Sequence, residues 1–177
     1  LIFFYLCLYF TPQLLAKPAD GVGLAFEGGS LKPIHSSTEK NFNSSNYYGI
    51  SFDYQWRIRK NYTFSLLGFE RGGIAKRPPH SEFEYYKLGF VGAEFRAWIG
   101  FFFIGIHGGR YLLTWIEDLN SYSEIGYEDG TGYGMGIETG SGIFVAVYSE
   151  ESRDIKFENM QNQKLYGNRF ILGYRWF

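Results

Sequence analysis

The chain has almost no cysteine, and neither positive nor negative charges are in clear excess. The only cysteine among the 177 residues is Cys7, which lies in an apolar stretch at the start. A single cysteine excludes an internal disulfide and a metal site built from several thiolates. The 17 basic and 18 acidic residues give a net charge of −1. Proteins that bind nucleic acid usually carry a basic surface, so we expect no nucleic-acid partner.

Long apolar runs are missing after residue 16. The longest run there is WIGFFFIGI, the nine residues from Trp98 to Ile106. Nine residues are too few to cross a bilayer as a helix, but they suit a tilted strand. The mean hydropathy of −0.20 is too polar for a bundle of membrane helices. Since no sustained helical period of apolar residues occurs in this part either, we expect little helix.

The first ten residues, LIFFYLCLYF, are wholly apolar, and TPQLLA follows them. An apolar core of that length ending near a small residue is typical of a secretory signal peptide. We predict a signal peptide over residues 1–16, truncated at its start because residue 1 is Leu and no basic residue precedes the core. The mature domain is then residues 17–177. A membrane anchor is the alternative, but the stretch is short for a span of about 20 residues.

Aromatic residues and glycine are abundant, at 21% aromatic residues and 23 glycines. The stretch YYGISFDYQW, residues 47–56, alternates between apolar and polar side chains, which gives a strand one apolar and one polar face. Similar stretches recur between clusters of Gly, Asn, Ser and Pro. We predict eight strands, over residues 20–28, 47–58, 62–70, 84–96, 101–113, 131–138, 143–149 and 165–176.

The connections between these strands alternate strictly between long and short. The long ones are predicted over residues 29–46, 71–83, 114–130 and 150–164, and the short ones over 59–61, 97–100 and 139–142. Bacterial outer-membrane barrels have this arrangement, with long extracellular loops, short periplasmic turns and an even number of strands. A soluble sandwich has no reason to sort its loops in this way. We therefore predict an all-β, eight-stranded, antiparallel, up-and-down transmembrane barrel.

The faces of the strands favour the same fold. In a membrane barrel the face of Tyr48, Ile50 and Phe52 meets lipid, and the opposite face, with small and ionisable residues, fills a narrow lumen. The predicted inward charges are Glu27, Asp53, Arg57, Glu94, Arg96, His107, Glu138 and Arg175. Paired charges would plug the lumen, and a narrow ion path is the alternative. The aromatics Tyr47, Tyr48, Trp56, Trp98, Trp115 and Trp176 lie near predicted strand ends, where aromatic girdles occur.

Two strands have no clear phase. In KLGFVGAEFRAW, the lipid face could hold either Leu88 and Phe90 or Val91, Ala93 and Phe95. A bulge near Gly92 would switch the faces and let both Glu94 and Arg96 point inward. In IFVAVY, both faces are apolar, so the pattern does not orient the strand.

The last strand is the most specific feature. The chain ends RFILGYRWF, in which Phe170, Leu172, Tyr174 and Trp176 share one face. This resembles the C-terminal strand that outer-membrane proteins present to their assembly machinery, and residues 17–177 resemble the small OmpA/OmpX-like barrels. The resemblance implies an integral protein of the bacterial outer membrane. It also implies outer-membrane lipid, lipopolysaccharide and the assembly machinery as partners, and a monomer.

Some barrels of this size modify lipids with Ser and His, so catalysis is the main alternative function. His35 and His80 lie in predicted polar loops, where a base is poorly held, and His107 lies in the predicted lumen. Lipid A deacylases carry a His two residues before a Ser late in the chain, whereas this chain has Ser149 in AVYSEES without that His. We predict no catalytic, cofactor-binding or metal-binding residues. The acidic stretch over residues 114–130 lacks the spacing of a calcium loop.

The sequence thus predicts a non-enzymatic outer-membrane barrel whose four long extracellular loops have a structural or surface-interaction role. A lipid A acyl hydrolase or acyltransferase of the same fold is the first alternative. A soluble periplasmic barrel that binds a small ligand is the second.

Overall fold

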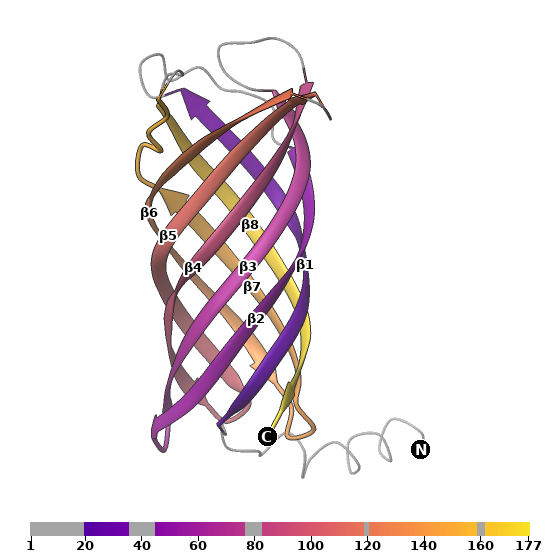
Figure 1. Cartoon of the computed structure of the whole chain (residues 1–177). Helices are drawn as coiled ribbons and strands as arrows, with labels where there is room; N and C mark the ends of the chain where they lie inside the picture. Colours follow the sequence, from indigo (N-terminus) through magenta and orange to yellow (C-terminus); the bar gives the residue numbers. More distant parts are fainter. Residues whose placement is uncertain (1–19, 36–44, 77–82, 119–120, 159–161) are drawn as a thin grey trace.

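Eight antiparallel strands form one closed barrel in the computed structural model, which describes residues 20–35, 45–76, 83–118, 121–158 and 162–177 (Figure 1). Each strand pairs with the next, and β8 pairs with β1. The strands are β1 (Gly21–His35), β2 (Ser45–Arg59), β3 (Tyr62–Lys76), β4 (Phe83–Ile99), β5 (Phe102–Asp118), β6 (Ser121–Glu138), β7 (Ile143–Ser152) and β8 (Gln163–Trp176). The predicted fold class and strand number are confirmed.

The short connections lie together at one end of the barrel, which we call the turn end. They join β2 to β3, β4 to β5 and β6 to β7. Gly100 and Gly142 have φ values of 63° and 92°, a left-handed conformation that glycine adopts without a steric penalty. The start of β1 and the C-terminus lie at the same end (Figure 1). We call the opposite end the outer end. None of the described residues forms a helix that could span a membrane.

Several strands extend further toward the outer end than the sequence predicts. The fifth connection, expected over residues 114–130, is instead mostly strand, because β5 ends at Asp118 and β6 begins at Ser121. Likewise β3 continues to Lys76 rather than residue 70. In these extensions the ladder of backbone hydrogen bonds continues although polar residues and glycine interrupt the outward apolar positions, so the regular alternation that marks a strand in the sequence is lost. The expectation of four long loops was therefore wrong for the fifth connection.

The apolar face of the opening stretch points away from the barrel, as predicted. Phe52 is 64% exposed, whereas its neighbour Ser51 is 7% exposed and points into the lumen. The outward residues in the turn-end half of all eight strands are mostly apolar, and we call them the apolar belt. They include Val22, Leu24, Phe26, Ile50, Phe52, Tyr54, Trp56, Phe64, Leu66, Val91, Phe95, Ile104, Ile106, Tyr133, Met135, Ile137, Ile143, Val147, Phe170, Leu172, Tyr174 and Trp176.

The structure settles the two strands of uncertain phase. β4 pairs without interruption with β3 and β5 across Gly92, so the predicted bulge there is absent. Leu88 and Phe90 face inward together with Glu94. A lumen wide enough for aromatic side chains makes the bulge unnecessary. In β7, Phe144 and Tyr148 point inward.

Aromatic side chains fill much of the lumen. The outer-end half holds a core cluster of Leu31, Tyr47, Leu67, Phe69, Ala75, Tyr86, Leu88, Phe90, Tyr111, Leu113, Trp115, Ile155 and Leu165. Tyr47, Trp98 and Trp115 were expected in girdles, but they are buried inside, where Trp98 and Trp115 donate hydrogen bonds to Thr63 and Gln163. The outward aromatics near the turn end do pack together, in the pairs Tyr54–Trp56, Trp56–Phe64, Tyr62–Phe95 and Tyr174–Trp176.

Candidate functional site

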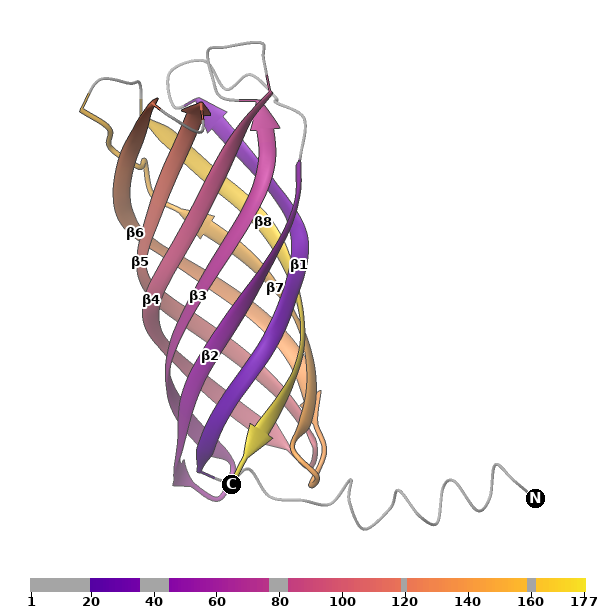
Figure 2. The same ribbon diagram turned by 45° about the vertical axis from the view of Figure 1, so that its right-hand side comes forward.

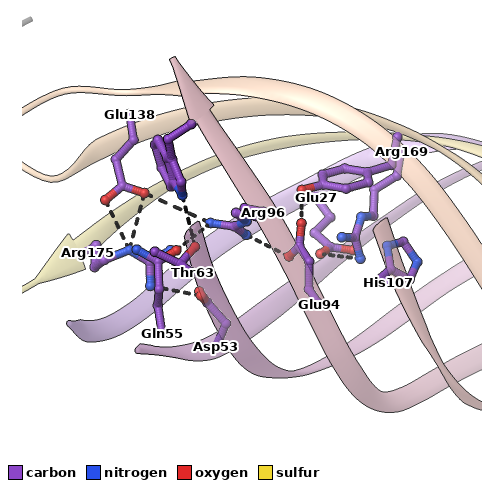
Figure 3. Close-up of polar contacts among 12 residues, drawn as sticks. Glu27, Asp53, Gln55, Thr63, Glu94, Arg96, His107, Glu138, Arg169 and Arg175 are labelled. Carbon is purple, nitrogen blue, oxygen red and sulfur yellow. Dashed lines mark hydrogen bonds and ion pairs between the residues drawn. The ribbon is translucent and has the colours of Figure 1, made fainter. Parts of the chain in front are cut away.

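The turn-end half of the lumen holds a cluster of buried ion pairs, which we call the lower cluster (Figure 3). Arg175 Nη1 lies 2.8 Å from Asp53 Oδ2, and Arg175 Nε lies 3.1 Å from Glu138 Oε1. Arg96 Nη2 lies 2.8 Å from Glu94 Oε2. Every one of these side chains is less than 10% exposed. Charges buried this deeply are tolerated because each contacts an opposite charge.

A glycine on the strand between them allows Asp53 and Arg175 to meet. Asp53 belongs to β2 and Arg175 to β8, and Gly23 of β1 is paired with both residues. A Cβ atom at Gly23 would lie 2.2 Å from Asp53 Oδ1. A side chain there would separate the two charges. The partner of Asp53 thus comes from the strand after next rather than from an adjacent strand.

A second group of ion pairs, which we call the central cluster, lies next to the lower cluster toward the outer end. Arg71 donates to Glu150 through Nη1 and Nη2, at 2.6 and 2.9 Å, and through Nε to Glu27, at 2.8 Å. Its guanidinium carbon lies 3.6 Å from the centre of the Phe69 ring. Arg169 lies 3.3 Å from Glu150 and 3.5 Å from Glu27. Two carboxylates and two guanidinium groups therefore form a closed network.

Tyr148 and His107 join the two clusters. The Tyr148 hydroxyl donates a hydrogen bond to Glu94, and Arg169 lies 4.8 Å from the centre of the Tyr148 ring. His107 Nε2 lies 3.5 Å from Glu150 Oε1, and the imidazole ring packs between Phe90 and Tyr148. The polar contacts thus continue from one cluster to the other (Figure 3).

The charges of the two clusters almost cancel. Five carboxylates lie with four guanidinium groups, and the members are Glu27, Asp53, Glu94, Glu138 and Glu150 with Arg71, Arg96, Arg169 and Arg175. The aromatic core cluster fills the outer-end side of the lumen. Side chains rather than an open channel therefore occupy the interior, as expected for eight strands.

The sequence identified most, but not all, of these charges. Of the predicted inward charges, Arg57 is exposed near the turn between β2 and β3 rather than in the lumen. Three members of the central cluster were missed, namely Arg71, Glu150 and Arg169. Arg71 and Glu150 were assigned to connections because β3 and β7 were predicted too short. Arg169 could have been found, since it is six residues before Arg175 and so shares its face.

Of the three histidines, His107 is the one whose side chain the structure describes. His80 lies outside the described residues, and of His35 only the backbone, at the end of β1, is described. His107 faces Glu150, Phe90 and Tyr148, and no described serine hydroxyl is hydrogen-bonded to it. Among the described residues no group of three or more His, Cys, Asp or Glu is arranged to hold a metal ion.

The outer wall changes character above the apolar belt. On β3 to β6 the next outward residues form exposed ion pairs, Glu70 with Lys87 at 2.8 Å and Arg110 with Asp129 at 3.4 Å. Charged side chains of this kind suit water or lipid headgroups rather than acyl chains. The wall is thus mainly apolar near the turn end, whereas toward the outer end ion pairs are interspersed with exposed apolar residues such as Ile74, Tyr85 and Ile125. We call this outer part of the wall the mixed zone.

The outer part of β6 has an open edge. β5 pairs with β6 over nearly its whole length, whereas β7 pairs only with Gly130–Glu138. Beyond that, a single bridge joins Tyr127 to Lys156. The stretch from Ser121 to Gly126 therefore has no strand on that side in the described part of the chain. Figure 2 shows β7 ending well below the outer ends of β5 and β6.

Solved structures of known barrels match this architecture over nearly the whole chain. Neisserial surface protein A (NspA) has a TM-score of 0.61 at 13% identity, covering 88% of this chain and 97% of that one. Ail, the attachment invasion locus protein of Yersinia pestis, has a TM-score of 0.57 at 12% identity, covering 90% and 100%. The fold is that of a small eight-stranded outer-membrane β-barrel. No family model and no curated protein sequence matches the chain.

The expected resemblance to small outer-membrane barrels is therefore confirmed for the fold. At 12–13% identity the likeness concerns the path of the backbone and not the residues at any site. The predicted signal peptide, residues 1–16, lies outside the described residues and stays a prediction.

Proposed function

We propose that the protein is an integral barrel of the bacterial outer membrane, without enzymatic activity, that recognises partners outside the cell through its outer end. The observation that carries the proposal is the continuous apolar belt around the closed barrel, which ends toward the outer end at the mixed zone with its exposed ion pairs. A closed barrel leaves no unpaired edge in the lipid, where each unpaired backbone group would cost several kcal/mol. A single strand shows the density of the belt, because β2 exposes four successive outward side chains, Ile50, Phe52, Tyr54 and Trp56.

The outer end is the part suited to recognition. The open edge of β6 offers unpaired backbone groups to an extended segment of a partner, a mode known as β-strand addition. Beside this edge, Ile125 and Tyr127 point outward and are 53% and 58% exposed. The names of Ail, an attachment and invasion protein, and of NspA, a surface protein, agree with a role of this kind.

The partners expected from the sequence belong to the same proposal. The outward row of Leu172, Tyr174 and Trp176 on β8 is available to the outer-membrane assembly machinery before the barrel closes. Lipid and lipopolysaccharide contact the belt and the mixed zone above it. We propose a monomer, because closure satisfies every strand edge within the belt.

The alternative of a lipid-modifying enzyme has no specific observation in its favour. His107, the histidine whose side chain is described, is 4% exposed and enclosed by the aromatic rings of Phe90 and Tyr148. A substrate in the membrane would have to cross the barrel wall to reach it.

Surface labelling tests the proposed orientation. In bacteria that display the protein, the variant Asp154→Cys should react with a membrane-impermeant maleimide, because Asp154 is exposed between β7 and β8. The variant Ser141→Cys, in the turn between β6 and β7, is the matched control and should stay unlabelled. Labelling of Ser141→Cys alone would reverse the orientation, and loss of the protein in a carbonate wash would exclude an integral barrel.

A binding screen on intact cells tests the role of the outer end. A panel of extracellular proteins and extended peptides is compared on cells with the wild type and with Ile125→Lys/Tyr127→Lys. We expect at least one ligand to bind the wild type and to bind the double variant several-fold less. The control variant is Lys87→Ala, which lies on β4, away from the open edge of β6, and should leave binding unchanged. Equal binding to all three proteins would contradict the proposal.

A further inference from the structure

A groove crosses the outer wall obliquely from β4 to β2. It lies between two rows of outward side chains, each row joined by the pairing of successive strands. The start of the groove, within the apolar belt, is lined by Phe95, Ile106, Tyr133 and Met135. Because the strands are tilted, the groove rises toward the outer end as it passes around the barrel. Six steps between strands of about 4.8 Å give it a length of roughly 29 Å.

The groove changes from apolar to hydrogen-bonding at its upper end. There one row consists of four small uncharged polar residues, namely Ser149, Asn168, Ser30 and Asn46. The row on the belt side holds Val147 and Phe170. That row has no side chain at Gly28, which lies between Phe170 and Tyr48 in the strand pairing, and this leaves the groove open.

The four polar side chains lack protein partners. Within the described part of the chain, none of the side chains of Ser149, Asn168, Ser30 and Asn46 takes part in a hydrogen bond or an ion pair. On β3 and β4, by contrast, the corresponding zone includes charged residues that pair with one another, such as Glu70 with Lys87. Uncharged hydroxyl and amide groups at the edge of an apolar zone gain by binding a ligand with hydroxyl groups of its own.

We propose that this groove is a specific site for a glycolipid of the outer leaflet. An acyl chain of the lipid lies against the apolar start of the groove. The sugar headgroup donates hydrogen bonds to, and accepts them from, the row of Ser149, Asn168, Ser30 and Asn46. The inference rests on the proposed membrane location. It goes further in stating that one side of the barrel binds a sugar-bearing lipid in preference to other lipids.

Native mass spectrometry of the purified protein tests the site, with lipid A and phosphatidylglycerol as probes. The two lipids share acyl chains and negative charge, but only lipid A carries sugars. We expect the wild type to retain one lipid A at concentrations at which phosphatidylglycerol is removed. The double variant Ser149→Val/Asn168→Leu keeps the shape and an apolar surface, so it should still fold. It should retain lipid A about tenfold less, which corresponds to the loss of about 1.4 kcal/mol of hydrogen bonding.

Two further variants keep the result interpretable. Thr131→Val removes an outward hydroxyl of β6 that does not line the groove, and its retention of lipid A should equal that of the wild type. Val147→Trp fills the groove without removing a polar group and should also weaken retention. Equal retention of both lipids, or unchanged retention in the double variant, would overturn the glycolipid site. Such a result would leave the membrane location intact, since surface labelling and carbonate washing test that separately.

Discussion

At the scale of single residues, Arg71 has the most demanding position in the molecule. Its side chain is fully buried, and all three of its nitrogen atoms donate to carboxylates of Glu27 and Glu150. Removing such a group leaves two buried negative charges without their main partner, which is costly in a medium of low polarity. The charge network is thus expected to hold β1, β3 and β7 together across the lumen.

We predict that Arg71→Met destabilises the barrel by about 3–5 kcal/mol, because it leaves Arg169 to face the two buried carboxylates of Glu27 and Glu150. Glu150→Gln alone should also be costly, since it removes the charge that faces Arg71. The double variant Arg71→Met/Glu150→Gln should cost less than the sum of the two single changes.

Equilibrium unfolding in lipid vesicles measures these free energies. Lys87→Met, which removes an exposed partner of Glu70, is the matched control and should cost at most about 1 kcal/mol. Strictly additive costs of Arg71→Met and Glu150→Gln would show that the two residues do not interact.

At the scale of the strand, the sequence is informative where one face is apolar and the other is polar. The phase of β2 was correct throughout the belt, since Phe52 points outward and Ser51 inward. In β7 the two faces are equally apolar, so only the pairing with β6 and β8 decides the orientation. In β4 the inward face changes from apolar Leu88 to charged Glu94. In the sequence this change looks like a switch of faces, and it therefore led to the incorrect prediction of a bulge.

The outer extensions of the strands could not be predicted for a related reason. Beyond the belt the outward face of β6 mixes charged Asp129 with apolar Tyr127, and the inward face holds Gly126 and Gly130. Without a regular alternation this stretch resembles a loop in the sequence. Glu150 of the central cluster was missed for this reason, because the end of β7 was assigned to a loop. Contacts between strands that are not adjacent, such as Asp53 with Arg175, depend on the shear of the closed barrel and leave no local pattern.

We predict that Phe52→Arg destabilises the barrel by about 2–4 kcal/mol if the residue lies near the middle of the bilayer. Phe52 packs over Gly68 of β3 on the outer wall, so an arginine there would meet acyl chains. Ser51→Ala is the matched control on the inward face and should cost far less. Unfolding in vesicles of defined lipid compares the two, and equal costs would contradict the assignment of the faces.

At the scale of the whole molecule, the filled lumen argues against transport of hydrated solutes. The lower and central clusters occupy its middle, and the aromatic core cluster closes its outer end. Hydrated ions need an open aqueous path, which barrels of many more strands provide. The lumen therefore serves as the structural interior of the protein, and this is why the proposed recognition is assigned to the outer end.

We predict that the purified protein gives no stable, porin-sized current steps in planar-bilayer recording. Phe90→Ala/Tyr111→Ala, which removes two rings from the core cluster, should raise the frequency of small openings. Large, stable steps from the wild type would show that the lumen is not closed by its side chains.

The central claim is that the apolar belt meets lipid while the charged and aromatic face fills the barrel. The four tryptophans allow one direct test, because Trp56 and Trp176 are 38% and 52% exposed on the outside, whereas Trp98 and Trp115 are 4% and 1% exposed inside. Four variants, each keeping one tryptophan and replacing the other three by Phe, are reconstituted in vesicles of lipids with brominated acyl chains. Bromine quenches indole fluorescence on contact, so we predict strong quenching of Trp56 and Trp176 and little of Trp98 and Trp115. Strong quenching of the inner pair, with the outer pair unaffected, would contradict the account.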